Sequence, residues 1–261
     1  MDKGIGIAGI AGRMGHMLVE EVAAAGITLA GGIDRDGAAA PNRARLFPDI
    51  AALAAACDVV VDFTHASAVQ AHAAALAAAG TAWVLGTTGL AAADDAAVAT
   101  AARRIAVVQA PNFSPGVNLV LALAERMAAA LPGDDYDAEV LEMHHRQKVD
   151  APSGTAIGLG QAVARGRGVA LEVVRDSGRD GHTGPRKPGA IGFAALRGGQ
   201  VVGEHTLIFA AAGEHIAVSH RAFDRRVFAT GAVRAARWVA GRPAGHYSMM
   251  DVLGMGSPSA A

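Results

Sequence analysis

The feature that most constrains the fold of this sequence is a glycine-rich turn between a predicted strand and a predicted helix near the N-terminus. Lys3 to Ala8 is mainly apolar, as in a short strand, and Gly12 to Ala25 has the composition of a helix. The sequence that joins them, GIAGRMG (residues 9–15), permits a tight turn because glycine adopts backbone conformations that other residues avoid. A strand that passes directly into a helix predicts the start of a β-α-β unit.

The same alternation continues through the first part of the chain. Alanine-rich segments of helical composition separate several further runs of β-branched and large apolar residues. These runs predict strands at Thr28–Ile33, Val59–Asp62, Ala82–Leu85 and Ile105–Gln109. Strands that alternate with helices indicate a mostly parallel sheet covered on both faces, and the chain is 52% hydrophobic, enough for a packed core.

The pattern changes at residues 110–116, APNFSPG, where two prolines and a glycine predict a domain edge. A chain of 261 residues suits one large domain or two smaller ones. Beyond the edge we expect a long strand over 137–147, a polar turn over 148–154 and a loop over 176–189. Helices are predicted over 117–131, 155–164 and 225–240, and three strands, expected to pair antiparallel, over 191–196, 200–210 and 215–220.

Composition argues against several classes of partner. A net charge of −1 and an aromatic content of 4% disfavour a nucleic-acid partner, which needs a basic surface and stacking side chains. The longest apolar stretch, 66–85, is interrupted by polar residues and a glycine, so no membrane span is expected, and the N-terminal apolar run is too short for a secretory signal. Cys57 is the only cysteine, which fits a reducing compartment. We therefore expect a soluble cytoplasmic protein.

The glycine turn has the features of a dinucleotide-binding site. Its glycines let the backbone approach a pyrophosphate, and the following helix offers free N–H groups. Asp34 stands about 20 residues further on, where a ribose-binding carboxylate is expected, and Arg35 beside it suits the extra phosphate of NADP. The alternative is a plain strand-to-helix connector with two surface charges, because Ala11 replaces the second glycine of the usual fingerprint.

A cationic segment in the second half is the most informative stretch. His144, His145, Arg146 and Lys148 place four potential cations within five positions, and an extended strand would put alternate members on one face. Such a cluster usually has an anionic partner because the charges repel one another. The following sequence, PSGT (152–155), leads into a predicted helix whose N–H groups would bind a carboxylate.

Two alternatives compete for this segment. A charged strand edge exposed to solvent is one, since such charges guard edges against pairing. A metal site is the other, because the histidines are adjacent, but they lack helical spacing and no cysteine lies near. We expect no metal site, and we expect the remaining histidines of this half to be ordinary turn or strand residues: His182, His205, His215 and His220.

These motifs together resemble the dihydrodipicolinate reductase family, also called 4-hydroxy-tetrahydrodipicolinate reductases. The resemblance covers nearly the whole chain, in the family's order, and its most specific string is HHRQKVDAPSGTA (144–156). The other matching strings are GIAGRMG (9–15), VDFT (61–64), GTTG (86–89), APNFSPGVN (110–118), GHTG (181–184), GAIGF (189–193) and GEHT (203–206).

The resemblance implies a role for each matching residue. His144 would be the proton donor or acceptor and Lys148 the proton donor, while His145, Gly154 and Thr155 would bind the substrate's carboxylates. Asp34 would bind the adenosine ribose, with Arg35 available to a 2′-phosphate. The remaining cofactor-binding residues would be Gly9, Ile10, Ala11, Gly12, Arg13 and Met14 at the pyrophosphate, and Gly86, Thr87, Thr88, Ala110, Pro111, Asn112 and Phe113 beside the nicotinamide half.

The resemblance also implies a fold and a reaction. The fold would be α/β, with a Rossmann-type dinucleotide-binding domain over 1–113 and 222–261. An inserted α+β domain over 114–221 would bind substrate and form a homotetramer. The reaction would reduce 4-hydroxy-tetrahydrodipicolinate, a small dicarboxylate, to tetrahydrodipicolinate with NADH or NADPH, in the diaminopimelate route of lysine biosynthesis.

Two other functions use parts of the same pattern. Another two-domain NAD(P)-dependent amino-acid dehydrogenase would share the glycine turn but would not need the HHRQK and SGT arrangement. A non-catalytic NAD(H)-sensing protein would keep residues 1–110 and have no use for proton donors beside a carboxylate clamp.

Overall fold

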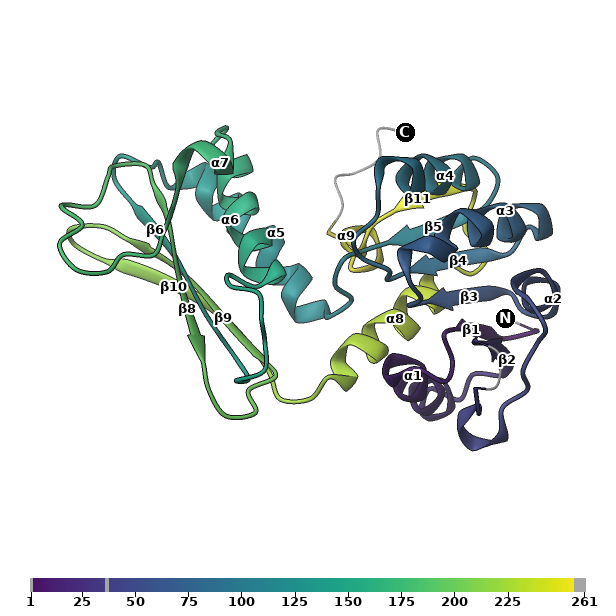
Figure 1. The fold of residues 1–261 in the computed structure, drawn as a ribbon. Helices are drawn as coiled ribbons and strands as arrows, with labels where there is room; N and C mark the ends of the chain where they lie inside the picture. Colours follow the sequence, from purple (N-terminus) through teal and green to yellow (C-terminus); the bar gives the residue numbers. More distant parts are fainter. Residues whose placement is uncertain (1, 36–37, 256–261) are drawn as a thin grey trace. The chain divides into compact units, whose positions relative to one another are not determined.

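The chain folds into two compact units. The structure, a computed structural model, describes residues 2–35 and 38–255. Unit 1 comprises Met1–Pro115 and Arg226–Ala261, and unit 2 comprises Gly116–Arg225, so unit 2 is inserted into the sequence of unit 1 (Figure 1). The family resemblance implies borders after residues 113 and 221, whereas the two units divide after Pro115 and after Arg225, directly before α8.

Unit 1 is built on a six-stranded sheet in the order β11-β5-β4-β3-β1-β2. Every pairing in it is parallel. All four residues of β1 and of β3 are buried, as expected where helices cover both faces of a parallel sheet. The strands are β1 (Ile5–Ala8), β2 (Leu29–Ile33), β3 (Val59–Asp62), β4 (Ala82–Leu85), β5 (Ala106–Gln109) and β11 (Gly245–Tyr247).

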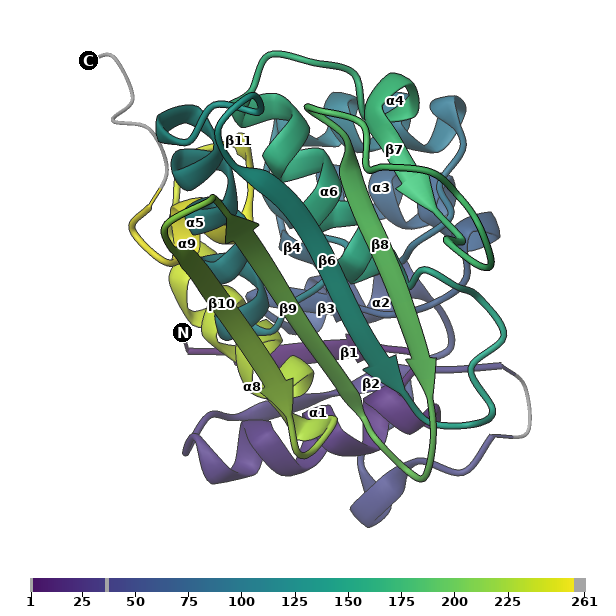
Figure 2. The same ribbon diagram turned by 90° about the vertical axis from the view of Figure 1, so that its left-hand side faces the viewer.

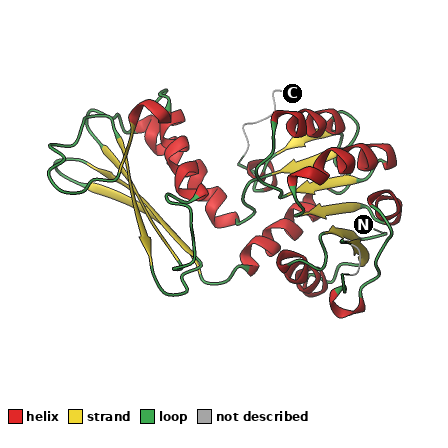
Figure 3. Ribbon diagram, viewed as in Figure 1, coloured by secondary structure: helices red, strands yellow, loops and turns green. Residues whose placement is uncertain are grey.

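Helices pack on both faces of this sheet (Figure 3). One core contains α1 and α8, through residues such as Leu18 and Ala232, and the other contains α2, α3 and α4, through residues such as Leu76. The Rossmann-type arrangement is therefore confirmed. The helices are α1 (Arg13–Ala24), α2 (Ile50–Ala56), α3 (Val69–Ala79), α4 (Ala92–Ala102), α8 (Arg226–Val239) and α9 (Met249–Val252), with 3-10 turns η1 (Pro41–Arg43) and η2 (Ala66–Ala68).

Unit 2 is a mixed sheet with helices on one face. Its strand order is β10-β9-β6-β8-β7. Figure 2 shows this sheet face on, with α5 and α6 behind it. The strands are β6 (Asp137–His144), β7 (Arg175–Ser177), β8 (Ile191–Arg197), β9 (Gly203–Ala210) and β10 (His215–Ala222), and the helices are α5 (Pro115–Ala130), α6 (Gly154–Gly166) and α7 (Leu171–Val174).

The two faces of this sheet differ in cover. Alternate residues of β9 are buried, because one side packs against α5 and α6 through a core that includes Val140, Leu207 and Phe209. The opposite face carries Leu141 and Leu196, which are 37% and 49% exposed. No described element of unit 2 covers that face (Figure 2).

The predicted antiparallel pairing of all three late strands is wrong for β8. β6 lies between β8 and β9, pairing parallel with β8 and antiparallel with β9, while β9 and β10 form the expected antiparallel hairpin. The glycine-rich connection after β8 passes the end of β6, where Gly198 N–H donates to the carbonyl of His144 at 2.9 Å. The glycines therefore serve a crossover and not a tight hairpin.

The predicted strand over 137–147 is too long, because β6 ends at His144. Its neighbours also end there, since β8 stops at Arg197 and β9 starts at Gly203. The chain turns instead, and Lys148 N–H donates to the carbonyl of His145 at 3.1 Å. Strand alternation therefore does not place His144 and Lys148 on one face.

Among the described residues, no helix is both long enough and apolar enough to cross a membrane.

Candidate active site

The carboxyl ends of the parallel strands gather the predicted cofactor-binding residues of unit 1. Gly9 to Met14 follow β1, Asp34 and Arg35 follow β2, Gly86 to Thr88 follow β4 and Ala110 to Phe113 follow β5. These strands run parallel, so the four segments lie at one edge of the sheet. The chain leaves β1 toward β2 on one side and β3 on the other, which is the kind of switch point where α/β sheets bind ligands.

The glycine turn forms a cradle that only glycines allow. Gly9 has a φ of +80°, a conformation that favours glycine. A Cβ atom on Gly15 would lie 2.3 Å from the carbonyl oxygens of Gly9 and Ile10, which is too close for any side chain. Gly12 caps α1 without a side-chain hydrogen bond. The first N–H groups of that helix therefore suit an anion such as a pyrophosphate.

Asp34 joins the end of β2 to this turn. Its carboxylate accepts hydrogen bonds from the backbone N–H groups of Ala11, at 2.7 Å, and Arg35, at 2.8 Å. A carboxylate has about four acceptor positions, so it can still accept from a ribose hydroxyl. Arg35 is exposed beside it. Both side chains line a cleft of about 580 Å³, together with Gly9, Gly12, Ile33, Phe63, Thr64, His65, Ser67, Ala68 and His72.

Thr64 and His72 line this cleft and have no role in the sequence prediction, nor does the buried Asp62 that both contact. Asp62, fully buried at the end of β3, accepts from the N–H and hydroxyl of Thr64 at 2.9 and 2.7 Å. Its other oxygen lies 2.7 Å from Nδ1 of His72, on α3. The VDFT string contains this aspartate, and a buried acid at the end of a strand is the signal that marks it.

The segments after β4 and β5 form a second wall. The N–H of Gly86 donates to the carbonyl of Asp62 at 2.8 Å. A Cβ on Gly86 would meet the ring of Phe63 at 2.3 Å, so the aromatic ring packs directly on the glycine. That ring also contacts Phe113 edge-on, with the ring centroids 5.5 Å apart. The cradle, the cleft and the wall together fit a dinucleotide.

His144 lies at the end of β6 in unit 2 and is 8% exposed. Its Nδ1 is 2.6 Å from Oε2 of Glu142. Burial lowers the pKa of His144 most, and the charges of Lys148 and Arg197 lower it further, although the hydrogen bond and charge of Glu142 oppose the shift. His144 is therefore a neutral imidazole at neutral pH.

Glu142 is the centre of a buried network and is 1% exposed. Arg197 donates to both of its oxygens, at 2.9 and 2.8 Å, and the backbone N–H of Ser153 donates to Oε1 at 3.1 Å. Burial alone would raise the pKa of Glu142, but the hydrogen bonds from Arg197 and His144 outweigh it and lower the pKa. Glu142 is thus an ionised acceptor.

The turn before α6 is arranged as an anion site. Ser153 caps the helix, with its hydroxyl oxygen accepting the N–H of Ala156 at 3.2 Å. Gly154 is exposed and Thr155 is half-buried at the first turn, where helix N–H groups attract carboxylates. His205, 5% exposed, lies 3.1 Å from the Ser153 hydroxyl through Nε2, and burial, followed by the charge of His144, lowers its pKa to about 4.

The remaining cationic residues lie in the turn after β6. Lys148 pairs with Asp150 at 2.8 Å, and its charge acts on the pKa of His144, so the two side chains share one electrostatic environment. His145 is half-buried with Nε2 3.3 Å from the guanidinium of Arg225. In the described chain its buried Nδ1 has no hydrogen-bond partner. Arg146 is exposed.

The other histidines do not form a metal site in the described part of the chain. Within residues 2–35 and 38–255, no three histidine, cysteine, aspartate or glutamate side chains are grouped to hold a metal ion. His182 and His215 are exposed, on a loop and at the start of β10. The prediction that His205 is an ordinary strand residue is incomplete, because it contacts Ser153 and packs edge-on against His144 with ring centroids 5.1 Å apart.

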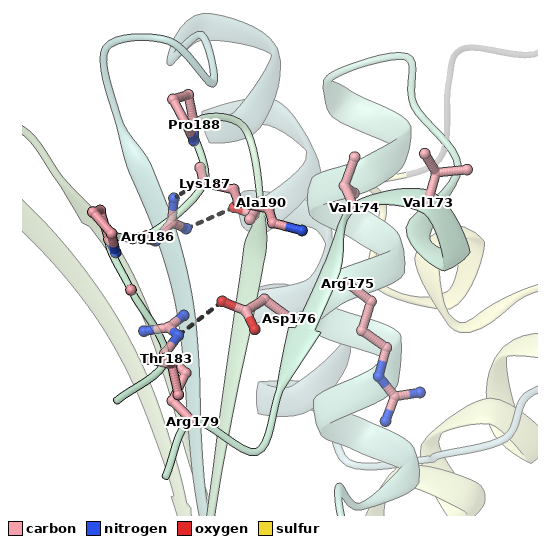
Figure 4. A pocket seen from close by; sticks show the side chains of 12 residues that line it. Val173, Val174, Arg175, Asp176, Arg179, Thr183, Arg186, Lys187, Pro188 and Ala190 are labelled. Atoms are coloured by element: carbon pink, nitrogen blue, oxygen red, sulfur yellow. Dashed lines mark hydrogen bonds and ion pairs between the residues drawn. The ribbon is translucent and has the colours of Figure 1, made fainter. Parts of the chain in front are cut away.

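A separate pocket in unit 2 contains none of the predicted site residues. It has a volume of about 350 Å³ and lies between α7, β7 and the segment before β8 (Figure 4). Its three arginines are already bonded: Arg179 to Asp176 and Glu139, Arg186 to Asp137 and Glu139, and Arg175 to the hydroxyl of Ser177. The guanidinium groups of Arg179 and Arg186 fasten the loop over 178–190, and none of the three is poised for a ligand.

Comparisons with known proteins bear on the whole chain. Residues 3–113 match the family model described as dihydrodipicolinate reductase, N-terminus, and residues 116–253 match the C-terminus model. A 4-hydroxy-tetrahydrodipicolinate reductase of Granulibacter bethesdensis is 69% identical over 253 residues, covering 96% of this chain and 97% of the relative. One of Acidiphilium cryptum is 63% identical, covering 97% and 98%.

A solved structure has the same fold. It is a dipicolinate-bound dihydrodipicolinate reductase from Paenisporosarcina sp. TG-14, with a TM-score of 0.78 and 24% identity, covering 95% of this chain and 97% of that one.

Proposed function

Because the chain belongs to the dihydrodipicolinate reductase family, we propose that its units divide the family's reaction between cofactor and substrate. The reaction is the reduction of 4-hydroxy-tetrahydrodipicolinate to tetrahydrodipicolinate by a reduced pyridine nucleotide, a step in the diaminopimelate route of lysine biosynthesis. The observation that carries the division is that the cationic segment, the capped turn before α6 and the Glu142 network meet at the end of β6.

Unit 1 is proposed to bind the cofactor along the edge described above. The turn over Gly9 to Met14 holds the pyrophosphate, Asp34 binds the adenosine ribose and Arg35 pairs with a 2′-phosphate when one is present. Gly86 to Thr88 and Ala110 to Phe113 flank the nicotinamide half. The two charges side by side support use of both NADH and NADPH.

Unit 2 is proposed to bind the substrate through its carboxylates. His145, Gly154 and Thr155 form the clamp, supported by the N-terminus of α6 and by the position of His145 beside the guanidinium of Arg225. A small dicarboxylate fits this arrangement. The ammonium of Lys148 and the nearby guanidiniums add an attractive field for two negative charges.

The proton chemistry is assigned to Lys148 and His144. A bound nicotinamide would supply the hydride, the 4-hydroxyl group would leave as water, and a proton must be supplied as charge develops on the substrate ring. Lys148 is the donor that is available from the start. His144 is neutral in the free protein with its Nδ1 proton toward Glu142, so its Nε2 first accepts a proton. A bound dicarboxylate raises the pKa of His144 and lets it donate in turn.

The uncovered face of the unit 2 sheet supports a homotetramer. Leu141 and Leu196 are exposed there, on neighbouring strands of one continuous surface, and apolar patches of this kind mark protein interfaces. We also propose a cytoplasmic location, supported by the single, buried thiol of Cys57, which a reducing compartment accommodates.

The activity test is consumption of NADPH and NADH with freshly prepared substrate. We expect turnover with both cofactors and competitive inhibition by pyridine-2,6-dicarboxylate, a planar mimic. Turnover of a different amino-acid substrate instead would favour another dehydrogenase. Tight cofactor binding without any turnover would favour a sensor, and either result would reject the proposal.

A further inference from the structure

The carboxylate of Glu142 receives four hydrogen-bond donors on two oxygens. Oε2 accepts from Nδ1 of His144 at 2.6 Å and from Arg197 at 2.9 Å. Oε1 accepts from Arg197 at 2.8 Å and from the backbone N–H of Ser153 at 3.1 Å. Glu142 is 1% exposed, and its contacts with His144 and Ser153 are buried while those with Arg197 are part-buried. Only a group that accepts at both ends satisfies such a set of donors.

This geometry fixes the tautomer of His144. An ionised carboxylate cannot donate, so Nδ1 of the imidazole carries the proton and Nε2 has the free lone pair. Nε2 is left open toward β9, where a Cβ on Gly203 would lie only 3.0 Å away. The glycine at 203 therefore keeps the space beside the reactive nitrogen clear.

The same carboxylate joins the histidine to the substrate turn. Its bond to Ser153 N–H holds the residue whose side chain caps α6, directly before Gly154 and Thr155. Arg197 also donates to the carbonyl of Asp150 at 2.6 Å, so it fastens the segment that carries Lys148. The Glu142–Arg197 ion pair thus contacts His144, the residue before Gly154 and the segment that follows Lys148.

We propose that Glu142 is a positioning residue for the reaction: it sets the tautomer of His144 and holds the histidine in register with the carboxylate-binding turn, while Arg197 keeps Glu142 ionised and in place. This inference rests on the proposed role of His144. Buried carboxylates that orient a catalytic imidazole in this way commonly determine which nitrogen reacts.

The two members of the pair act on His144 in opposite directions. The negative charge of Glu142 favours the imidazolium, and the positive charge of Arg197 disfavours it. Removing Glu142's charge should therefore lower the pKa of His144 further, and removing that of Arg197 should raise it. If the pair served only to pack the strand, without its charges acting on His144, neither change in the pKa of His144 would appear.

The decisive variants are Glu142→Gln and Arg197→Met. Glutamine keeps the size of Glu142 but replaces one acceptor oxygen with a donor NH₂ group. In place of Oε2, that group would face Nδ1 of His144 and Arg197. In place of Oε1, it would face Arg197 and the N–H of Ser153. We expect kcat to fall by about 10²-fold or more, the range for disturbing a positioned proton-transfer group. Binding of pyridine-2,6-dicarboxylate should weaken, and cofactor affinity should be unchanged. Glu125→Gln is the control, because Glu125 on α5 forms a partly exposed ion pair with Arg165 of α6 and the same change of residue removes it.

The pKa of His144 is read in two ways. It is the ionisation that disappears from the pH profile of kcat/KM in His144→Gln, and the histidine NMR titration that disappears in the same variant. We expect it to move down in Glu142→Gln and up in Arg197→Met. The NMR reading needs no turnover, so it separates this inference from the proposed reaction.

Several results would overturn the inference. A Glu142→Gln protein with normal kcat would do so, as would slow variants whose His144 pKa matches that of the wild type. If Glu142→Gln fails to fold, the upward shift in Arg197→Met decides the question. An inactive wild type with both NMR shifts present would reject the proposed function, and only the control of the His144 tautomer by Glu142 would stand.

Discussion

His144 and His145 are adjacent in sequence but are suited to different tasks. His144 points to the helix-covered side of the sheet, where Glu142 and burial determine its protonation. His145 follows the end of β6, lies beside Arg225 and keeps a buried Nδ1 without a partner in the described chain. The first environment favours proton transfer and the second favours anion binding. Two consecutive residues are therefore proposed to have different roles.

Loss of either proton-transfer group should slow catalysis without weakening the binding of the cofactor. His144→Gln and Lys148→Ala should each reduce kcat by about 10²–10⁴. Arg146→Gln, an exposed cation in the same turn, is the matched control and should keep kcat near the wild-type value. Turnover is followed by NADPH absorbance and cofactor binding by fluorescence. Near-normal kcat in both variants would reject the catalytic assignment.

Cofactor choice should depend on the charges at the end of β2. Asp34→Asn keeps an oxygen for the N–H of Ala11 but removes the charge, so the efficiency ratio of NADPH to NADH should rise. Arg35→Ala should lower this ratio. Each shift should be about tenfold or more, because a hydrogen bond to a charged group contributes about 1.5–3 kcal/mol.

Steady-state kinetics with both cofactors measure this ratio. Arg103→Ala, on an exposed residue after α4 and so at the opposite edge of the sheet, is the control. An unchanged ratio in Asp34→Asn would mean that the carboxylate serves only the turn.

At the scale of elements, the chain uses the same device twice. α1 begins after Gly12 with no side-chain cap, and α6 begins after Ser153 with exposed Gly154 at its first position. Both helices offer N–H groups and a positive dipole end to an anion. One suits a pyrophosphate and the other a carboxylate, and each belongs to a different unit.

Gly15→Ala tests the first of these helix ends. The new Cβ would collide with the carbonyl oxygens of Gly9 and Ile10 at 2.3 Å, so the free energy of unfolding should fall by about 1–3 kcal/mol and cofactor binding should weaken. Gly158→Ala is the control, because its Cβ would make an ordinary 3.5 Å contact inside α6. It should be neutral or stabilising by about 0.5–1 kcal/mol. Equal melting temperatures for the two variants would contradict the account.

Local patterns were sufficient for much of the fold. Val59–Asp62 and Ala82–Leu85 were predicted with the bounds that the structure has, because buried parallel strands are short apolar runs. The end of β6 was missed, since it depends on where the neighbouring strands stop. β7, α7, β11 and α9 were also missed, because they are three or four residues long and, unlike β3 and β4, do not form distinct runs of β-branched or large apolar residues between turn signals.

The site shows the same division. The resemblance supplied His144, Lys148 and the SGT turn, but it gave no role to Glu142, which shares a strand face with His144 two positions away. Its partner Arg197 is 55 residues distant in sequence, and the pair forms only because β6 and β8 are neighbours. Contacts of that kind depend on strand order, and the order of β6, β8 and β9 differs from the one that their succession in the sequence indicates.

At the scale of the whole molecule, the main feature that a single chain leaves open is the face of the unit 2 sheet opposite α5 and α6. Its exposed leucines lie on β6 and β8, strands that pair along their whole length. Of the proposed substrate site, Glu142, His144 and Ser153 lie on the helix-covered face, as their mutual contacts require. Assembly through the open face would therefore leave that site accessible.

Leu141→Lys should disrupt the proposed homotetramer, because it places a charge in the middle of the open face. Light scattering at micromolar concentration should report four subunits for the wild type and fewer for the variant. Val169→Lys, at a position of similar exposure after α6, should leave the assembly unchanged. A wild type that is monomeric and fully active would exclude the tetramer.

The central claim is that the end of β6 in unit 2 is where substrate is bound and protonated. A crystal structure with NADH and pyridine-2,6-dicarboxylate tests it most directly. We expect the mimic's carboxylates on His145, Gly154 and Thr155, with Lys148 and Nε2 of His144 within hydrogen-bond reach of the ligand. A mimic bound elsewhere, such as the arginine-lined pocket of Figure 4, with the β6 end unchanged, would contradict the claim.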